Sequence, residues 1–324
     1  MSSRFASAAR ATCRAVARGA VIVAALVPLS AVAADGETIS EQVDAVMSRA
    51  ARLGMPVLAV ASTDSCTEGP LLKQRLAADP ILQPLVARFG LVELRMSGDD
   101  RWTWKRWQEH FDTHRRQSPQ VFVVRADGKK MFSGDPPADL VGFLHKHLAQ
   151  CGQAIVPRQA QLFESQLEAA SQLQAAGDLA AAVRAVTPAA RVPSHARPVV
   201  QSIAFRAAVT KRLLASIERL AIDPAAGADS LAAAEELVAL GDEYATTLPD
   251  VARAARERTA LIGREPAGRE MVRQAQLLRR AAVAARRSAD RGLALYEQII
   301  ATDPDSPAAE LAAVRLRSID HGPR

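Results

Sequence analysis

Cysteine is scarce in this sequence, which holds only Cys13, Cys66 and Cys151 in 324 residues. A fold held together by a network of disulfides is therefore excluded at this length. No two cysteines stand three positions apart, so a Cys-x-x-Cys redox pair is absent as well. A single bridge between Cys66 and Cys151 remains open if the protein works in an oxidising compartment.

Motifs of several common enzyme classes are also missing from residues 34–324. The segment has no glycine-rich nucleotide loop, zinc motif, Gly-x-Ser-x-Gly or paired catalytic carboxylates. We therefore expect no cofactor. His110 and His114 stand at i, i+4 on a predicted helix, which is a spacing found among metal ligands. Since no motif supplies a third ligand, we predict a solvated helix face and no metal.

Long apolar runs are absent except near the N-terminus. Arg4, Arg10, Arg14 and Arg18 precede an apolar run that is shorter than the roughly 20 residues of a membrane-spanning helix and ends in Ala31-Val32-Ala33. This pattern predicts a signal peptide over residues 1–33 and a periplasmic or secreted protein. An uncleaved anchor is the alternative. The sequence has no paired arginines before the run, which disfavours twin-arginine export.

Excess charge is small once this segment is removed. Residues 1–33 carry four arginines and no acids, so the formal charge falls from +6 to +2. The remaining arginines are mixed with acids throughout. We therefore predict no nucleic-acid binding. Because the apolar run is removed with the signal peptide, we also predict no stable membrane span after cleavage.

The rest of the chain divides into two parts that differ in residue composition and in secondary-structure signals. Residues 55–150 contain β-branched runs bounded by turn signals, whereas residues 157–320 are rich in Ala, Leu, Arg, Gln and Glu, with few strand signals. We therefore predict two domains, over residues 34–152 and 153–324. The first is expected to be α/β and the second all-α.

The first of these domains alternates helix and strand signals. Helices are predicted over 39–54, 68–80, 101–114 and 137–152, strands over 55–63 and 91–97, and a hairpin over 120–134 around Asp127-Gly128. Parallel strands joined by crossover helices and followed by an antiparallel hairpin define a mixed sheet with helices on both faces.

These segments carry a resemblance to a known family. "PVLAVAST" (56–63), the cysteine after it, "DPILQPLVARFGLVELRMSGDD" (79–100) and "SPQVFVVRADGKKMFSG" (118–134) resemble the thioredoxin superfamily, in particular its secreted thioredoxin-like branch. The resemblance covers roughly residues 40–150. It implies a thioredoxin fold in which Pro119 is a cis-proline that faces the active-site cysteine. An ordinary trans proline at the start of a strand would look the same in sequence.

The resemblance places Cys66 at the position of the attacking thiol. The second cysteine of the family's pair is replaced by Gly69, and the tryptophan that usually precedes the pair is replaced by Ser65. A helix N-terminus favours the thiolate form of Cys66, whereas Asp64 and Glu68 oppose it. Cys66 is thus either a monothiol that forms mixed disulfides or a packed remnant of a lost site. Cys151 is expected to lie too far away to bridge to it.

Two further sequence features each allow two interpretations. The stretch "RWTWKRW" predicts that Trp104 and Trp107 pack on one helical face, although tryptophans beside basic residues also suit a partner surface. In the second domain, "AGDLAAAVRAVTP" and "ADRGLALYEQIIATDPDSPAAE" resemble tetratricopeptide-like helix pairs. Gly177 and Gly292 are expected in turns between helices, and Pro188 and Pro304 at helix ends. An irregular helical bundle is the alternative.

Together these observations predict an exported thioredoxin-like protein with a degenerate single-cysteine site. We expect it to act mainly as a protein-interaction module, binding protein or peptide partners through its helical domain and its thioredoxin-like surface. The competing hypothesis is a monothiol oxidoreductase that acts on disulfides of envelope proteins through Cys66, with Pro119 beside it.

Overall fold

The computed structural model describes residues 39–98, 101–113, 117–223 and 227–320. The predicted signal peptide and His114 lie outside these residues. The described residues up to 150 form α1 (Ile39–Leu53), β1 (Val57–Ser62), α2 (Glu68–Ala78), α3 (Gln83–Val86), β2 (Gly90–Arg95), α4 (Arg101–Phe111), β3 (Gln120–Val124), β4 (Lys130–Gly134) and α5 (Leu140–Gln150). Apart from the four-residue helix α3, which was not predicted as a separate element, this is the order of elements that the sequence predicts.

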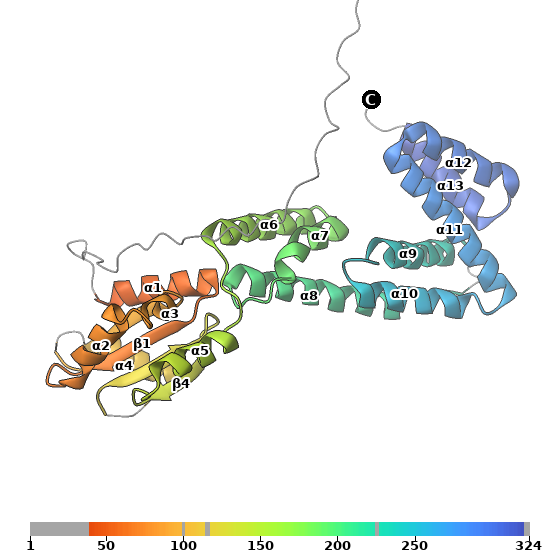
Figure 1. The fold of residues 1–324 in the computed structure, drawn as a ribbon. Coiled ribbons are helices and arrows are strands. Elements are labelled where there is room, and N and C mark those ends of the chain that lie inside the picture. The colour runs from red at the N-terminus through yellow and green to blue at the C-terminus, as the bar shows by residue number, and fades with distance from the viewer. Residues whose placement is uncertain (1–38, 99–100, 114–116, 224–226, 321–324) are drawn as a thin grey trace, which may run out of the picture. The chain divides into compact units, whose positions relative to one another are not determined.

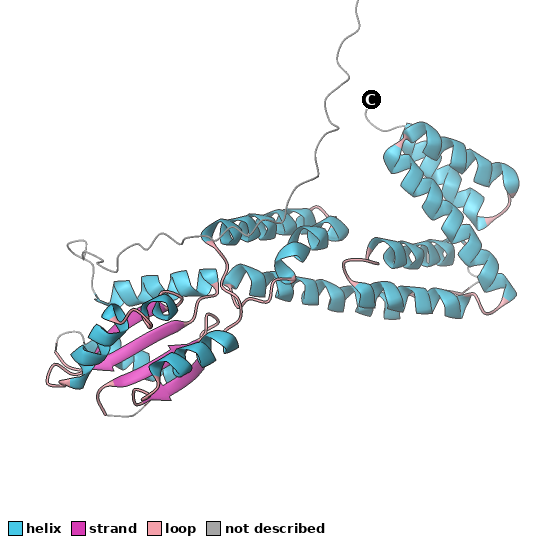
Figure 2. Cartoon of the chain, in the orientation of Figure 1, coloured by secondary structure: helices cyan, strands magenta, loops and turns pink. Residues whose placement is uncertain are grey.

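The four strands form one mixed sheet in the order β2-β1-β3-β4 (Figures 1 and 2). Strand β1 pairs in parallel with β2, and Val57 lies opposite Gly90. It pairs antiparallel with β3, where Val57 lies opposite Val124, and β3 and β4 form the predicted hairpin. Gly128 sits in the hairpin turn with φ of +85°, a conformation that favours glycine. The predicted mixed sheet is confirmed.

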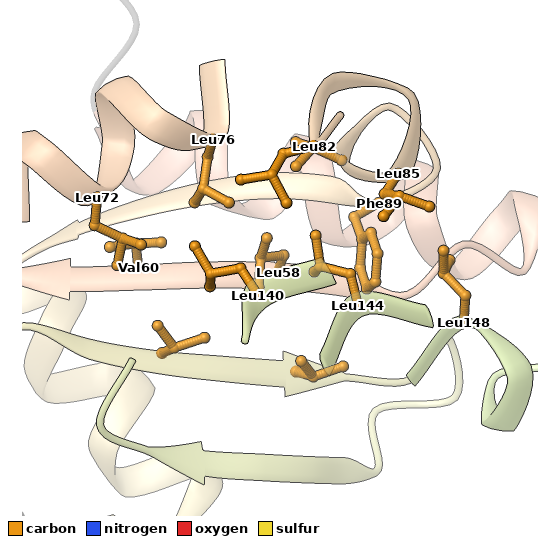
Figure 3. Packing of buried hydrophobic residues seen from close by; sticks show 13 residues of the cluster. Leu58, Val60, Leu72, Leu76, Leu82, Leu85, Phe89, Leu140, Leu144 and Leu148 are labelled. Carbon is orange, nitrogen blue, oxygen red and sulfur yellow. The ribbon is translucent and has the colours of Figure 1, made fainter. Parts of the chain in front are cut away.

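Both faces of the sheet are covered, which explains why every residue of β1 is buried. On one face, Leu58 and Val60 pack with leucines from α2, α3 and α5. Figure 3 shows Leu72 of α2 and Leu144 of α5 on this side, both directed toward the strands. Alternate residues of a strand point to opposite faces, so Val57, Ala59 and Ala61 pack with α1 and α4 instead.

The aromatic side chains of α4 anchor that second face. Trp104 and Trp107 are buried, and each ring centroid lies 5.9 Å from that of Phe122 in β3. Trp102 is 60% exposed and lies beside Arg101 and Lys105. The packing predicted for Trp104 and Trp107 is therefore confirmed.

From residue 157 on, the regular elements of the described residues are all helices. These are α6 (Pro157–Ala175), α7 (Leu179–Ala190), α8 (Arg197–Arg219), α9 (Ala228–Glu243), α10 (Pro249–Ile262), α11 (Pro266–Arg287), α12 (Ala289–Thr302) and α13 (Pro307–Asp320). Prolines open several of them, where the missing N–H costs no hydrogen bond. Asp178 and Ser288 cap α7 and α12 by accepting hydrogen bonds from backbone N–H groups. The prediction that this part of the chain is all-α is confirmed for the described residues.

Two details of these helices differ from the sequence prediction. Gly177 has φ of +85° in the turn between α6 and α7, as expected, but Gly292 lies inside α12. A Cβ on Gly292 would come within 2.4 Å of the Ala285 side chain, so this glycine permits a close approach to α11 and forms no turn. Pro188 does not end α7, which continues to Ala190, because a proline near the last turn removes only one donor.

The end of α1 and the first helices of the helical region share a small apolar cluster. Leu53 at the end of α1 packs with Ile155, Phe163 and Val199. The Leu53 carbonyl accepts a hydrogen bond from Ile155 N at 2.8 Å. Arg52 pairs with Glu164 of α6 through two hydrogen bonds of 2.7 and 2.8 Å. We call this cluster the α1–α6 junction.

Farther along the chain, α9 and α13 are joined by a partly buried ion pair. Arg315 donates two hydrogen bonds to Glu235, at 2.8 and 2.6 Å, across 80 positions of sequence. The Glu235 side chain is 10% exposed and that of Arg315 is 31% exposed. The hydrogen bond to Glu235 raises the pKa of Arg315 above its usual value.

Candidate thiol site

Cys66 lies in the short connection between the carboxyl end of β1 and the N-terminus of α2. The connection is closed by a hydrogen bond from Cys66 N to the Thr63 carbonyl at 3.1 Å. Cys66 is partly exposed and forms no disulfide. Its sulfur is therefore reachable from solvent while the backbone around it is held in place.

Ser118 is the main polar partner of this thiol. Its Oγ accepts a hydrogen bond from Thr63 N at 3.1 Å and lies 3.5 Å from the Thr63 hydroxyl. Since the oxygen acts as acceptor toward Thr63, the hydroxyl proton is left for the Cys66 sulfur. This hydrogen bond is the largest cause that lowers the pKa of Cys66 below its ordinary value.

The start of α2 adds to this effect. Backbone N–H groups of Gly69 and Glu68 also bond the Cys66 sulfur and lower its pKa, as orphan donors of a first helical turn do. Desolvation and, to a smaller extent, the Glu68 carboxylate act in the opposite sense and raise this pKa. The Asp64 side chain accepts a hydrogen bond from Ser97 at 3.0 Å. The outcome of these opposed effects is a lowered pKa, which favours the thiolate.

Pro119 follows Ser118 directly at the start of the hairpin. The Ser118–Pro119 peptide bond is cis, and the Pro119 side chain is buried. The cis bond therefore joins the residue that hydrogen-bonds Cys66 to the first residues of β3. Pro119 is thus the chain neighbour of the residue whose hydroxyl bonds the Cys66 sulfur.

Gly69 faces the same thiol from the first turn of α2. A Cβ at this position would lie 3.8 Å from the Cys66 sulfur, but only 2.6 Å from the Ser62 Cβ. Real Cβ atoms do not approach each other so closely, and Ser62 is held in β1, where its carbonyl accepts from Met96 N at 3.0 Å. The position of a resolving cysteine is therefore closed by the neighbouring strand.

Cys151 lies at the opposite end of the sheet. It is buried and free, and burial is the largest cause that raises its pKa. Its electrostatic partners Arg125 and Asp127 follow the end of β3, which pairs with the start of β1. The length of β1, 6 residues, spans about 17 Å, well beyond the roughly 7 Å that a disulfide permits between Cα atoms. The prediction that Cys151 is remote from Cys66 is confirmed.

Of the two histidines predicted as a pair, His110 lies in α4, and His114 lies outside the described residues. His110 is exposed and its ring lies against that of Phe111, with centroids 4.6 Å apart. The helix ends at Phe111, and Asp112 adopts φ of +46° after it. Within the described ranges no group of three or more His, Cys, Asp and Glu side chains is placed to hold a metal ion.

Two residues of the site were not predicted from the sequence. Ser118 supplies the hydroxyl that bonds Cys66, and its signal is its place immediately before Pro119. Ser62 closes the space beside Gly69, and nothing in the strand pattern distinguishes it from the other small residues of β1. Thr63 orients Ser118 through its backbone N–H.

Comparison with known proteins finds no family model and no curated protein that matches this chain. In the part of the chain that the structure describes, no helix has both the length and the apolar content to cross a bilayer.

Proposed function

We propose that this protein is an exported thioredoxin-fold interaction module of the cell envelope, with a degenerate single-thiol site joined to a tetratricopeptide-like helical region. The helical region binds protein or peptide partners, and the thiol region offers a second contact surface beside Cys66. Paired helices build extended surfaces of this kind more readily than enclosed active sites.

Three features support the thioredoxin part of the proposal. The sheet order β2-β1-β3-β4 has two parallel strands joined by crossover helices and an antiparallel hairpin, as the resemblance implies. Helices cover both faces. The residue before the cis proline hydrogen-bonds the cysteine that precedes α2.

One observation carries the interaction role over enzymatic turnover. Position 69, where a resolving thiol would stand, holds a glycine that is closed in by Ser62 at 2.6 Å. A Cys66 thiolate that attacks a disulfide breaks that S–S bond, forms a mixed disulfide with one sulfur and releases the other as a thiolate. Release of Cys66 then needs an external thiol. The site therefore favours capture of a partner over its reduction.

The second candidate function is monothiol exchange with envelope disulfides, and a specific observation favours it. The Ser118 hydroxyl and the first N–H groups of α2 lower the pKa of Cys66, which raises the thiolate fraction at neutral pH. A cysteine that only fills space would not require hydrogen-bond donors to its sulfur. This reaction also depends on an outside thiol, such as dithiothreitol in an assay.

An insulin-reduction assay tests the choice between the two. With dithiothreitol as reductant, we expect the protein to raise the rate of insulin precipitation little above the uncatalysed rate, because no internal thiol completes the exchange. The Cys66→Ser variant is expected to give the same rate. A clear acceleration that disappears in Cys66→Ser would overturn the interaction role and establish the oxidoreductase.

Ser118→Ala tests the geometry of the thiol itself. Removing the hydroxyl takes away the largest cause that lowers the pKa of Cys66, so this pKa is expected to rise. At a fixed pH below that pKa the thiolate fraction then falls, and alkylation by iodoacetamide slows. The measurement is the alkylation rate of Cys66 against pH, with the less accessible Cys151 followed separately by mass spectrometry.

Ser118→Thr is the matched control, since it keeps a hydroxyl at the same position. Its alkylation profile is expected to remain close to that of the unchanged protein. If Ser118→Ala and the unchanged protein share one profile, Ser118 does not act on the thiol.

A further inference from the structure

One face of α11 carries arginine and small apolar side chains along most of its length. At helical spacing it presents Arg269, Val272, Arg273, Gln276, Arg280, Val283, Ala284 and Arg287. The opposite face packs Met271, Ala275 and Leu278 into the core between α9, α12 and α13. The core therefore leaves the arginine face of α11 unused.

This face lines a groove between α11 and α9. Two hollows, of about 550 Å³ and 510 Å³, share Val238, Asp242 and Gln276 in their walls and therefore adjoin. The first extends to Arg291 at the start of α12, and the second to Arg256 of α10. Each hollow has the size of an ordinary ligand pocket. We call the two together the α9–α11 groove.

The groove is strongly basic. Arg279, Arg280, Arg287 and Arg291 line the first hollow, and three more arginines line the second, whereas Asp242 is the one acid in either wall among the described residues.

Four of these arginine side chains already have hydrogen-bond partners within the protein. Arg279 pairs with Glu243 at 2.6 Å and Arg273 with Glu270 at 2.5 Å. The other two arginines of the second hollow donate to backbone carbonyls, Arg256 to Gly241 and Arg269 to Arg264.

The three remaining arginines are exposed and unpaired. The side chains of Arg280, Arg287 and Arg291 have no hydrogen-bond or ion-pair partner within the described part of the chain. From Arg280 to Arg287 the helix rises about 10 Å, a length that an extended peptide covers in about three residues. Val283 and Ala284 lie between them. The groove thus alternates positive charge with apolar surface.

We propose that the α9–α11 groove binds an acidic segment of a partner protein in an extended conformation. Carboxylates of the segment pair with Arg280, Arg287 and Arg291, and apolar side chains between them rest on Val238 and Val283. Arginine suits this role because its guanidinium binds a carboxylate through two parallel hydrogen bonds. The inference rests on the proposed role of the helical region in binding proteins.

The groove composition favours a peptide over a nucleic acid. Single-stranded nucleic acids are held largely by bases stacked on aromatic side chains, and the described walls of the groove contain no aromatic residue. Asp242 also lies in both hollows, where it would repel a continuous row of phosphates. A peptide can place a neutral or basic residue opposite this carboxylate.

An array of random decapeptides, probed with the full chain under reducing conditions, tests the proposal. Reduction removes any contribution from a Cys66 disulfide. We expect the captured peptides to be enriched in Asp and Glu interspersed with apolar residues. Reversing the three unpaired charges, with Arg280→Glu, Arg287→Glu and Arg291→Glu together, is expected to weaken binding to the best array peptides by about tenfold or more.

The matched control reverses three exposed basic residues outside the groove, with Arg158→Glu, Lys211→Glu and Arg212→Glu together. It changes the net charge equally and is expected to leave peptide binding within about twofold. Equal losses in both triple variants would show that only net charge matters, and would overturn the groove as the site. Circular dichroism of both variants checks that they are folded.

Other outcomes separate this inference from the proposed function. Capture of peptides without acidic enrichment overturns the acidic groove but leaves the interaction module standing. Capture of no peptide at all counts against both. Binding of a labelled oligothymidylate strand that is lost in the groove variant, without acidic peptides being captured, would replace the peptide by a nucleic acid and overturn the inference.

Discussion

Replacing Gly69 by alanine is expected to lower the free energy of unfolding by about 2 kcal/mol. The new Cβ would lie 2.6 Å from the Ser62 Cβ, and that atom belongs to a paired strand and has no freedom to rotate away. Alanine in place of glycine within a helix gains up to about 1 kcal/mol in propensity, which is too little to offset the overlap. Urea unfolding followed by circular dichroism measures the difference.

Two variants of Ser62 identify the cause. Ser62→Gly removes the Cβ and is expected to recover most of the loss in the Gly69→Ala background, whereas Ser62→Ala keeps the Cβ and is expected to recover little. Each double variant is compared with the corresponding Ser62 single variant, since glycine within a strand itself costs roughly 0.5–1 kcal/mol. If Gly69→Ala is as stable as the unchanged protein, the wall beside Cys66 is not rigid.

The Ser62 side chain beside position 69 also limits any attempt to restore a dithiol site. Gly69→Cys places its Cβ against Ser62 before a bond to Cys66 can adopt ordinary disulfide geometry. We expect Gly69→Cys alone to leave the two thiols largely reduced. The Ser62→Gly and Gly69→Cys double variant is the one expected to form a disulfide between Cys66 and the introduced thiol, which thiol counting can detect.

Arg315→Met is expected to have the largest effect on the helical region, a loss of about 3 kcal/mol in the free energy of unfolding. It removes the two hydrogen bonds of 2.8 and 2.6 Å that Arg315 donates to Glu235, whose side chain is only 10% exposed in the unchanged protein. A buried charge without a partner is far more costly than an exposed one. Urea unfolding at neutral pH measures the loss.

A second arginine–glutamate pair provides the comparison. Arg273 and Glu270 are joined by two hydrogen bonds of 2.8 and 2.5 Å, but both side chains are about half exposed. Arg273→Met is therefore expected to cost less than about 1 kcal/mol. Glu235→Leu combined with Arg315→Met is expected to recover most of the loss, because no buried charge remains. Equal costs for the two arginine variants would contradict the importance of burial.

The sheet could be predicted from the sequence because its signals are local. The run from Val57 to Ser62 is continuously apolar or small, as in a strand buried on both faces, and Asp127-Gly128 marks the hairpin directly. Gly292 was misread because a glycine near a helix start resembles a turn. Its actual role depends on Ala285, which a different helix brings within 2.4 Å of its missing Cβ.

The residues of the candidate site, like the elements of the fold, were predicted only in part. Cys66 and Pro119 were selected from the sequence because the family resemblance places them, whereas Ser62 and Ser118 act through contacts that only the fold creates. Ser118 lies 52 positions from Cys66 and reaches it through the pairing of β1 with β3. The basic groove was missed because arginines on one face of α11 look like an ordinary solvated surface until α9 is placed opposite them.

The α1–α6 junction restricts how this protein can be divided. A fragment that ends near residue 152 would retain Leu53 but lose Ile155, Phe163 and Val199, which cover it. Gly54 would also lose its neighbour Ser194, whose hydroxyl lies 2.5 Å from where a Cβ would stand. Such a fragment exposes apolar surface around Leu53 that is buried in the full chain, and it is therefore prone to self-association. A soluble miniature of the thiol region needs either α6 to α8 retained or Leu53 exchanged for a polar residue.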